Sequence, residues 1–434
     1  MSKILSIDQA WKMLLNKYNI VENVNENGIF YMKSSQIREY KEPRLMAKWD
    51  SSENLPQPLK NNNLNILPVS RSEYAISDFK VYANLPELDA KIENMPCAQL
   101  ETYETIDIHS ITSESTAINI LLLSRILNNF LEVDDIAATF NGRMGTPQFE
   151  FLIDTHKNIK RSVAVKNAQC EIDGGFETND SVIILEAKNI VHPDFNVRQL
   201  YYPYRLWTSK VKKPVRLVFS IYSNMIYRLF EYKFENIGDY SSIILIRNKN
   251  YSLQDTTITI EDLQNIKKSI GLPQISDESG KDNVPFIQAD SVDRIISLLE
   301  NMYNHPMTPK QIIDLMGFVK RQYRYYVNAG KYLGLFEDCK IDGVYFVQLS
   351  SIGNKICKMN YKERQLKLVE LMLNHAIFFH FFEYIYKNGA FPTVNEVCKK
   401  MLELHIFDVN NSTVARRAQT VISWLKWIYT LTKL

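Results

Sequence analysis

The chain has 434 residues, of which 45% are hydrophobic and 23% are charged, as in an ordinary globular protein. This composition excludes a disordered chain and a fibrous repeat, and the length predicts two to four domains. The formal net charge of +2 excludes a uniformly basic protein, so any contact with nucleic acid must come from local basic patches.

Cysteine usage and hydropathy indicate the compartment. The five cysteines are odd in number and form no CxxC pair, which argues against a zinc ribbon or a disulfide framework. The most apolar stretch, residues 375–386, is too short to span a bilayer. The N-terminal sequence lacks the apolar block of a signal peptide. We therefore expect a soluble, cytoplasmic protein that does not contact membranes.

The first part of the chain predicts an α+β region over residues 1–110. After it, Ser113 is suited to cap a helix that extends to Phe130, because leucines recur at helical spacing. A second helix is expected to begin at Thr146–Pro147, with threonine as N-cap and proline in the first turn, and to include QFEFLIDTH.

Strand patterns follow. Val163–Asp173 and Ser181–Asn189 are two β-rich runs separated by a glycine turn at Gly174–Gly175, which predicts a hairpin. A tyrosine-rich helix (FNVRQLYYPYRLW) and two further strands (PVRLVFSIYS and MIYRLFEYKF) come next. This order predicts an α/β layered core over residues 111–272.

A polar segment separates this core from the rest of the chain. Residues 273–290 are rich in serine, glycine, aspartate and proline and are interpreted as a linker. Beyond it the pattern is mostly helical, and we divide it into units at 291–360 and 361–434.

Acidic and basic side chains gather at the end of the hairpin. Glu186 and Lys188 project to the same side of their strand, and pairing brings Asp173 beside them. The apolar run before Glu186 predicts a buried strand, in which charges are costly unless paired or metal-bound. Two carboxylates can hold Mg²⁺, which activates water for attack on a phosphodiester, while the lysine orients the water or stabilises charge. A solvated strand edge is the alternative for the ExK pattern alone.

These residues resemble the PD-(D/E)xK nuclease superfamily and, within it, the type II restriction endonucleases. The resemblance rests on Asp173 followed by Glu186-Ala187-Lys188 on a hairpin after a helix, and it covers roughly residues 65–250. It implies that Asp173 and Glu186 bind Mg²⁺, that Ala187 lends its backbone carbonyl, and that Lys188 assists the attacking water. Ile172 stands where the superfamily has proline.

The same resemblance suggests two further residues. An acidic residue on an upstream helix often completes such sites, and Glu150 on the expected second helix is our candidate. Gln199 begins a pattern similar to the QxxxY motif of related nucleases, although Pro203 occupies the tyrosine position.

Basic residues follow the proposed site. Between Glu186 and Arg216 there are seven basic and two acidic residues, a local charge of +5. This cluster, including Lys212 and Lys213, is suited to contact phosphates beside the scissile bond, although a solvated helix face explains it equally well.

The region 291–360 resembles a winged helix. Thr308 caps a short helix, Gly317 lies in a turn, and residues 320–331 form the second helix, which helix-turn-helix units place in the major groove. DNA binding is favoured over a protein contact or dimerisation. The residues expected to contact DNA are Lys320, Arg321, Gln322 and Arg324.

The last region carries a similar pattern. Residues 410–429 form a basic helix, capped by Ser412 or Thr413, that is interpreted as the recognition helix of a second winged-helix unit. Arg416 and Arg417 are expected to face outward toward DNA.

We therefore interpret the sequence as a type II restriction endonuclease that hydrolyses a specific double-stranded DNA site with Mg²⁺. One site per chain predicts a homodimer, and the family implies a cognate DNA methyltransferase. No Walker-type GxxxxGK[ST] motif is present, so we expect no ATP. A DNA-binding regulator with a degenerate nuclease core and a modification-dependent endonuclease remain as alternatives. Residues 1–110 have no definite role, and site recognition is left open for them.

Overall fold

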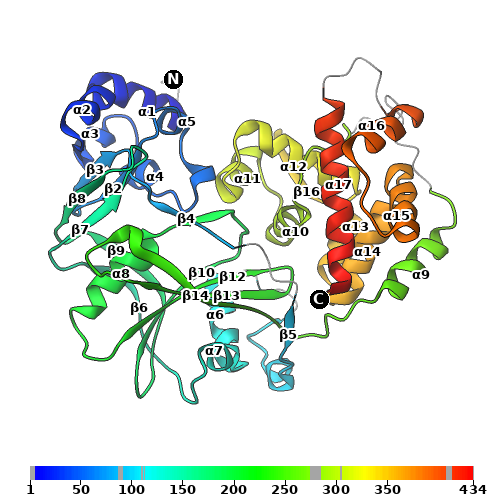
Figure 1. Ribbon diagram of the computed structural model, residues 1–434, viewed down its shortest axis with the longest axis horizontal. Helices are drawn as coiled ribbons and strands as arrows, with labels where there is room; N and C mark the ends of the chain where they lie inside the picture. The colour runs from blue at the N-terminus through cyan, green and yellow to red at the C-terminus, as the bar shows by residue number, and fades with distance from the viewer. Residues whose placement is uncertain are drawn as a thin grey trace.

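The computed structural model describes residues 5–86, 91–108, 111, 113–273, 285–303, 305–406 and 413–433. Figure 1 shows an N-terminal unit above a large sheet, and a helical C-terminal region beside both. The fold is thus mixed α/β with a helical C-terminal part, as the sequence predicts.

The N-terminal unit packs helices around a small sheet. The sheet is antiparallel in the order β1-β3-β2, and its core includes Trp11, Leu14 and Ile76. Ser6 caps the first helix through a capping box. The elements are α1 (Ile7–Lys17), α2 (Ile20–Asn27), β1 (Phe30–Lys33), α3 (Ser34–Arg38), α4 (Pro43–Ala47), η1 (Ser52–Asn54), α5 (Gln57–Asn61), β2 (Asn65–Pro68) and β3 (Glu73–Ser77).

The largest sheet among the described residues has seven strands in the order β5-β14-β13-β12-β10-β9-β6. β10 is antiparallel to β9 and parallel to β12, with α8 between these two strands in sequence. Its strands are β5 (Ile92–Asn94), β6 (Ala137–Gly145), β9 (Gln169–Glu177), β10 (Val182–Lys188), β12 (Val215–Ser223), β13 (Ile226–Phe234) and β14 (Ile243–Ser252). Smaller elements here are β4 (Tyr82–Asn84), β7 (Phe149–Asp154), β8 (Lys160–Val165), β11 (Asp194–Asn196), η2 (Ala98–Thr102) and η3 (Tyr240–Ser242).

Helices cover both faces of this sheet. The predicted helix after Ser113 is confirmed with its cap, but it divides into α6 (Glu114–Leu123) and α7 (Ile126–Leu131) at Arg125, which has a left-handed backbone. Both pack against one face, whereas the predicted tyrosine-rich helix, α8 (Arg198–Thr208), packs against the other. Residues of β10 alternate between the faces: Ile184 joins the core under α8, and Leu185 joins the core under α6.

The prediction of a helix that begins at Thr146–Pro147 is wrong. Residues 149–154 form β7, which pairs with β8 in a hairpin. Phe149, Phe151 and Ile153 are buried whereas Glu150 is exposed, so the apolar residues follow the period of two that belongs to a strand. The apolar alternation therefore outweighs the favourable Thr-Pro start.

The hairpin that carries the proposed site is confirmed as an antiparallel pair, but its turn lies elsewhere. Gly174 and Gly175 belong to β9, opposite Leu185 and Ile184 of β10, and the turn comes after Glu177. The glycines serve close packing: a Cβ on Gly175 would lie 2.4 Å from the backbone oxygen of Phe140 on β6. The first predicted strand, 163–173, is divided between β8 and β9.

The C-terminal region begins with three helices and a β-hairpin. These are α10 (Val292–Asn301), α11 (Pro309–Met316), α12 (Lys320–Tyr332), β15 (Phe336–Ile341) and β16 (Val344–Leu349). Thr308 caps α11, Gly317 ends it in the left-handed conformation, and Met307 bridges Val347. The predicted helix–turn–helix with a following strand pair is therefore present. Helix α9 (Ile260–Ile270) precedes this unit along the chain, and helix α13 (Ser351–Cys357) follows it.

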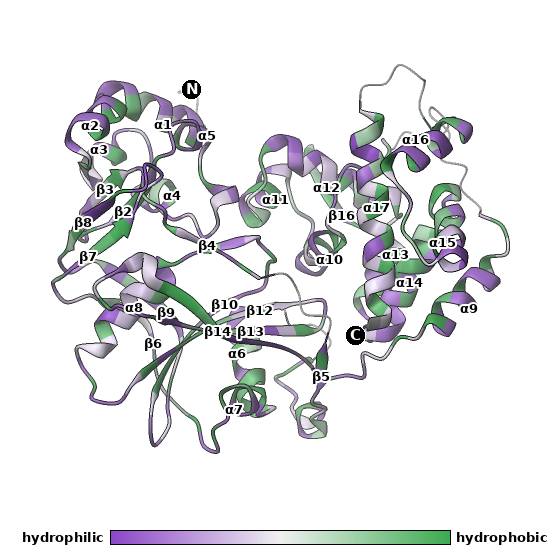
Figure 2. Ribbon diagram, viewed as in Figure 1, coloured by the Kyte–Doolittle hydropathy of each residue, from purple (hydrophilic) through white to green (hydrophobic). Residues whose placement is uncertain are grey.

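The end of the chain is helical. It comprises α14 (Tyr361–Leu373), α15 (Ala376–Asn388), α16 (Val394–Glu403), α17 (Val414–Thr430) and η4 (Leu431–Lys433). In Figure 2 hydrophobic and hydrophilic bands alternate along these helices, whose apolar residues share one core. Among the described residues of 361–434 there is no strand, so nothing there forms a wing. No helix in the described ranges combines the length and hydrophobicity needed to cross a membrane.

Two expectations fall partly outside the described ranges. Of the proposed linker at 273–290, residues 274–284 are not described, whereas Phe286, Ile287 and Ala289 are buried in the C-terminal core. Ser412, one of the two expected caps of the last long helix, also lies outside the described residues. Thr413 occupies the N-cap position of α17 without a side-chain cap.

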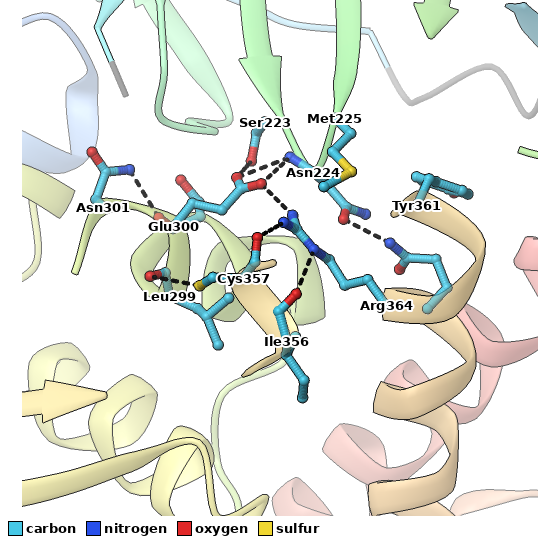
Figure 3. Close-up of polar contacts among 12 residues, drawn as sticks. Ser223, Asn224, Met225, Leu299, Glu300, Asn301, Ile356, Cys357, Tyr361 and Arg364 are labelled. Atoms are coloured by element: carbon cyan, nitrogen blue, oxygen red, sulfur yellow. Dashed lines mark hydrogen bonds and ion pairs between the residues drawn. The ribbon is translucent and has the colours of Figure 1, made fainter. Parts of the chain in front are cut away.

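An ion pair between a buried arginine and a half-buried glutamate joins the sheet to the C-terminal helices (Figure 3). Glu300 on α10 accepts hydrogen bonds from the Asn224 backbone in the β12–β13 turn and from Arg364 on α14, whose Nη1 lies 2.6 Å away. Arg364 also donates to the carbonyls of Ile356 and Cys357. The guanidinium and carboxylate are thus satisfied although little solvent reaches them.

Candidate active site

The proposed site lies where two neighbouring strands separate. Pairing of β9 with β10 ends at Gly174 and Leu185, and beyond this point Asp173 accepts a hydrogen bond from the Ala187 backbone at 3.0 Å. Because the N–H and C=O of one strand residue point to the same side, the Ala187 carbonyl faces the same gap. The splayed strands therefore place a carboxylate beside a backbone carbonyl.

Glu186 and Lys188 form a buried pair at the end of β10. The Lys188 Nζ lies 2.6 Å from a Glu186 carboxylate oxygen, and Gln199 on α8 donates to that oxygen at 2.5 Å. Glu186 is 6% exposed. Asp173, Glu186, Lys188 and Gln199, four residues singled out from sequence, thus meet at one place.

Two further carboxylates lie near Lys188. Asp50, in the loop after α4, has an oxygen 3.8 Å from Lys188 Nζ, and Glu114 at the start of α6 also acts on it electrostatically. Although burial alone lowers the pKa of Lys188, the surrounding carboxylates raise it above its ordinary value. Burial raises the pKa of Glu186 to about 8, helped by Asp173 and Asp50 and opposed by Lys188. Burial likewise raises the pKa of Glu114.

This arrangement suits a divalent cation chemically. Four carboxylates face one ammonium, so the fully ionised group carries a charge of −3, and hard oxygen donors are the ligands that Mg²⁺ prefers. Within the described residues, however, no three acidic, histidine or cysteine side chains are close enough to hold an ion as they stand. The chemistry of these oxygen donors suits such an ion, whereas Glu186 is in contact with Lys188 in this structure.

The group forms part of the lining of a cleft of about 580 Å³. The N-terminal unit lines one wall, and β6, β9, β10, α6 and α8 line the other. The acidic and basic residues of the lining are Arg38, Glu42, Arg44, Lys48, Asp50, Arg71, Glu114, Arg143, Glu171, Asp173, Glu186, Lys188 and Arg198.

Glu150 is not the helical acidic residue of this site. It lies on β7, where its carboxylate accepts from Ser162, and it is absent from the residues that line the cleft. Glu114 occupies the expected place instead, in the first turn of a helix that precedes the hairpin. The Ser113 cap identified this helix start in the sequence, but Asp50 has no comparable signal because it lies 138 positions from Lys188.

The expected phosphate contacts lie apart from the carboxylates. Lys213 pairs with Glu177 at 2.5 Å, and the loop that holds it and Lys212 leads into Val215, which pairs with Val182. These lysines therefore lie near the opposite end of β10 from Lys188. This position removes the reason for placing them beside the scissile bond.

The C-terminal basic residues differ in accessibility. Lys320, Arg321 and Arg324 are exposed on α12, whereas the Gln322 side chain accepts from the Val319 backbone as part of a cap. On α17, Arg416 is exposed and stacks over Tyr325, but Arg417 is half-buried and donates to the Phe286 carbonyl. The expectation that Arg417 faces outward is wrong because it is used in packing.

Comparison with known families divides the chain into three. Residues 8–76 match domain of unknown function DUF6996, residues 77–252 match DUF6997, and residues 294–433 match DUF7226. No curated protein and no solved structure matches the chain. The second match holds the whole of β9, β10 and α8, and the first holds the opposite wall of the cleft.

Proposed function

We propose that this protein is a type II restriction endonuclease of the PD-(D/E)xK superfamily, which hydrolyses phosphodiester bonds of a specific double-stranded DNA sequence with Mg²⁺. The convergence of Asp173, Glu186 and Lys188 in a cleft is the observation that carries the proposal. Its support includes the order of elements, in which a helix precedes three antiparallel strands and α8 connects β10 to a parallel neighbour.

The proposal assigns a role to each side chain. Asp173, Glu186 and the Ala187 carbonyl would hold Mg²⁺, with Glu114 replacing Glu150 as the helical acid. The bound ion supplies Lewis-acid polarisation of the phosphodiester and activation of water. Lys188 keeps its proton among the carboxylates and so places a positive charge beside the phosphate. Gln199 orients Glu186 through its amide N–H.

Sequence recognition is proposed for the C-terminal part. The elements from α10 to β16 follow each other in the order of a winged helix. Lys320, Arg321 and Arg324 are exposed on α12, the second helix of the helix-turn-helix. Because the described residues of the chain contain one candidate nuclease site, cleavage of both strands calls for a homodimer on a symmetric sequence. A cognate methyltransferase would protect host DNA.

Cleavage of unmethylated phage DNA, with and without Mg²⁺, tests the proposal. Discrete fragments that need Mg²⁺ and disappear in Asp173→Ala and Lys188→Ala are expected, while both variants still shift DNA in a gel. Uncut DNA with binding retained would contradict a simple restriction enzyme. Cleavage of modified DNA only would then identify the modification-dependent enzyme, and binding without any cleavage would identify the regulator.

A further inference from the structure

The N-terminal unit is fastened to the sheet beside the proposed site. Residues 49–52 run along β11: the Asp50 carbonyl accepts from the Asn196 backbone at 2.8 Å, and Ser51 and the Ser52 backbone donate to Asp194 at 2.6 and 2.8 Å. Glu53, next along the chain, binds Arg294 of α10 at 2.8 Å. This wall of the cleft is therefore held in place by contacts to both other parts of the molecule.

The wall carries four exposed cations. Arg38, Arg44, Lys48 and Arg71 all line the cleft, opposite the carboxylates on the sheet. Lys48 is already paired with Glu171, and Arg38 lies 3.7 Å from Glu42. Within the described part of the chain, neither Arg44 nor Arg71 has an ion pair, although the cleft contains six acidic residues.

We propose that this wall binds the phosphodiester backbone of the DNA strand that enters the cleft, with Arg44 and Arg71 as its main phosphate ligands. Guanidinium groups bind phosphate oxygens in a bidentate manner, and they keep their charge at any physiological pH. The carboxylates opposite repel the same phosphates, so cations on this wall are needed to bring the strand toward Lys188. The inference rests on DNA as the substrate of the proposed function and assigns a role to the N-terminal unit.

The test measures binding without cleavage. A labelled 30-base-pair duplex is titrated with the full-length protein in EDTA at salt concentrations from 50 to 200 mM. The slope of the logarithm of the association constant against the logarithm of the salt concentration is then compared between the wild type and each variant. For Arg44→Ala/Arg71→Ala the slope should become shallower by about two, because each phosphate contact contributes about one. Arg44→Lys/Arg71→Lys should restore it, since the charges remain.

A matched control uses Lys12→Ala/Lys268→Ala, which removes two exposed cations from α1 and α9, outside the cleft lining. Its slope should equal that of the wild type. An unchanged slope in the arginine double variant, or no DNA binding by the wild type, would overturn the inference. A wild type that binds through Arg44 and Arg71 but never cuts would overturn the nuclease proposal alone. A wild type that cuts while the arginine variant keeps its slope would overturn this inference alone.

Discussion

Glu186 combines burial with contacts of both signs, and this combination sets its protonation. Lys188 favours the carboxylate, whereas burial and the neighbouring Asp173 and Asp50 favour the acid, so its pKa rises to about 8. The Glu186 carboxyl is therefore protonated more easily than that of an ordinary glutamate. A divalent cation bound at Glu186, as proposed, would compete with a proton for the same oxygen atoms.

This competition predicts proton release on Mg²⁺ binding. At pH 7 the wild type should release about one proton per ion, and the affinity for Mg²⁺ should increase as the pH rises toward 8. Isothermal titration calorimetry in buffers of different ionisation enthalpy measures the number of protons released per bound ion. Glu186→Gln should bind the ion more weakly and release fewer protons; binding by the wild type without proton release would contradict the assignment.

Glu114 and Glu150 provide a matched pair of carboxylates. Glu114→Gln removes a carboxylate that faces Lys188, so the Mg²⁺ concentration for half-maximal cleavage should rise by about 10- to 100-fold. Glu150→Gln alters an exposed strand residue outside the cleft and should leave that concentration unchanged. Equal effects of the two substitutions in a magnesium titration of cleavage would show that Glu114 has no special role.

At the scale of secondary structure, β9 shows how one strand is shaped by two neighbours. It pairs with β10 along residues 174–177 and with β6 along a longer stretch that contains register shifts near Phe140. At Gly175 an added Cβ would clash with Phe140 of β6. The absence of a side chain there lets both pairings persist while β9 and β10 separate at Asp173.

Gly175→Ala is therefore expected to destabilise the protein by about 1–3 kcal/mol, because the new methyl group would meet the Phe140 backbone, which cannot move aside easily. Gly238→Ala is the control, since its Cβ has only the Asn236 side chain at 3.4 Å and should change stability by less than about 0.5 kcal/mol. Urea unfolding followed by circular dichroism measures both. Equal midpoints would contradict the tight packing of β6 on β9.

At the scale of the whole molecule, α10 connects the C-terminal region to the end of β10. Ser297 and Asn301 both donate to the carbonyl of Asn189, the residue after Lys188, at 3.4 and 3.5 Å. On the same helix, Glu300 binds Arg364 and the β12–β13 turn. The helical region and β10 are thus held together by one helix.

Removing the cation of this junction should weaken the whole protein. In Arg364→Met the Glu300 carboxylate loses its charged partner in a largely buried place, which is expected to cost about 3 kcal/mol. Lys362→Met breaks only the partly exposed pair with Asp262 and should cost less than about 1 kcal/mol. Thermal unfolding of both variants measures the difference, and similar melting temperatures would contradict a stabilising junction.

Features that depend on neighbours along the chain could be predicted from the sequence. Ser113 and Thr308 mark helix starts, and the apolar run before Glu186 predicts a buried strand that ends in charges, because capping and hydrophobic runs are local features. The same local logic failed at Thr146–Pro147, where a favourable helix start precedes an alternating strand that β8 completes.

Which distant residues share the candidate site depends on how the chain folds in three dimensions. Asp50 and Glu114 reach Lys188 through the packing of the loop on β11 and of α6 on the sheet, and neither contact leaves a periodic trace in the sequence. The separation of β9 from β10, and the cationic wall that faces it, likewise depend on pairing and burial between segments far apart in the chain. Such contacts depend on the free energy of the whole fold, which cannot be read from a short segment of the sequence.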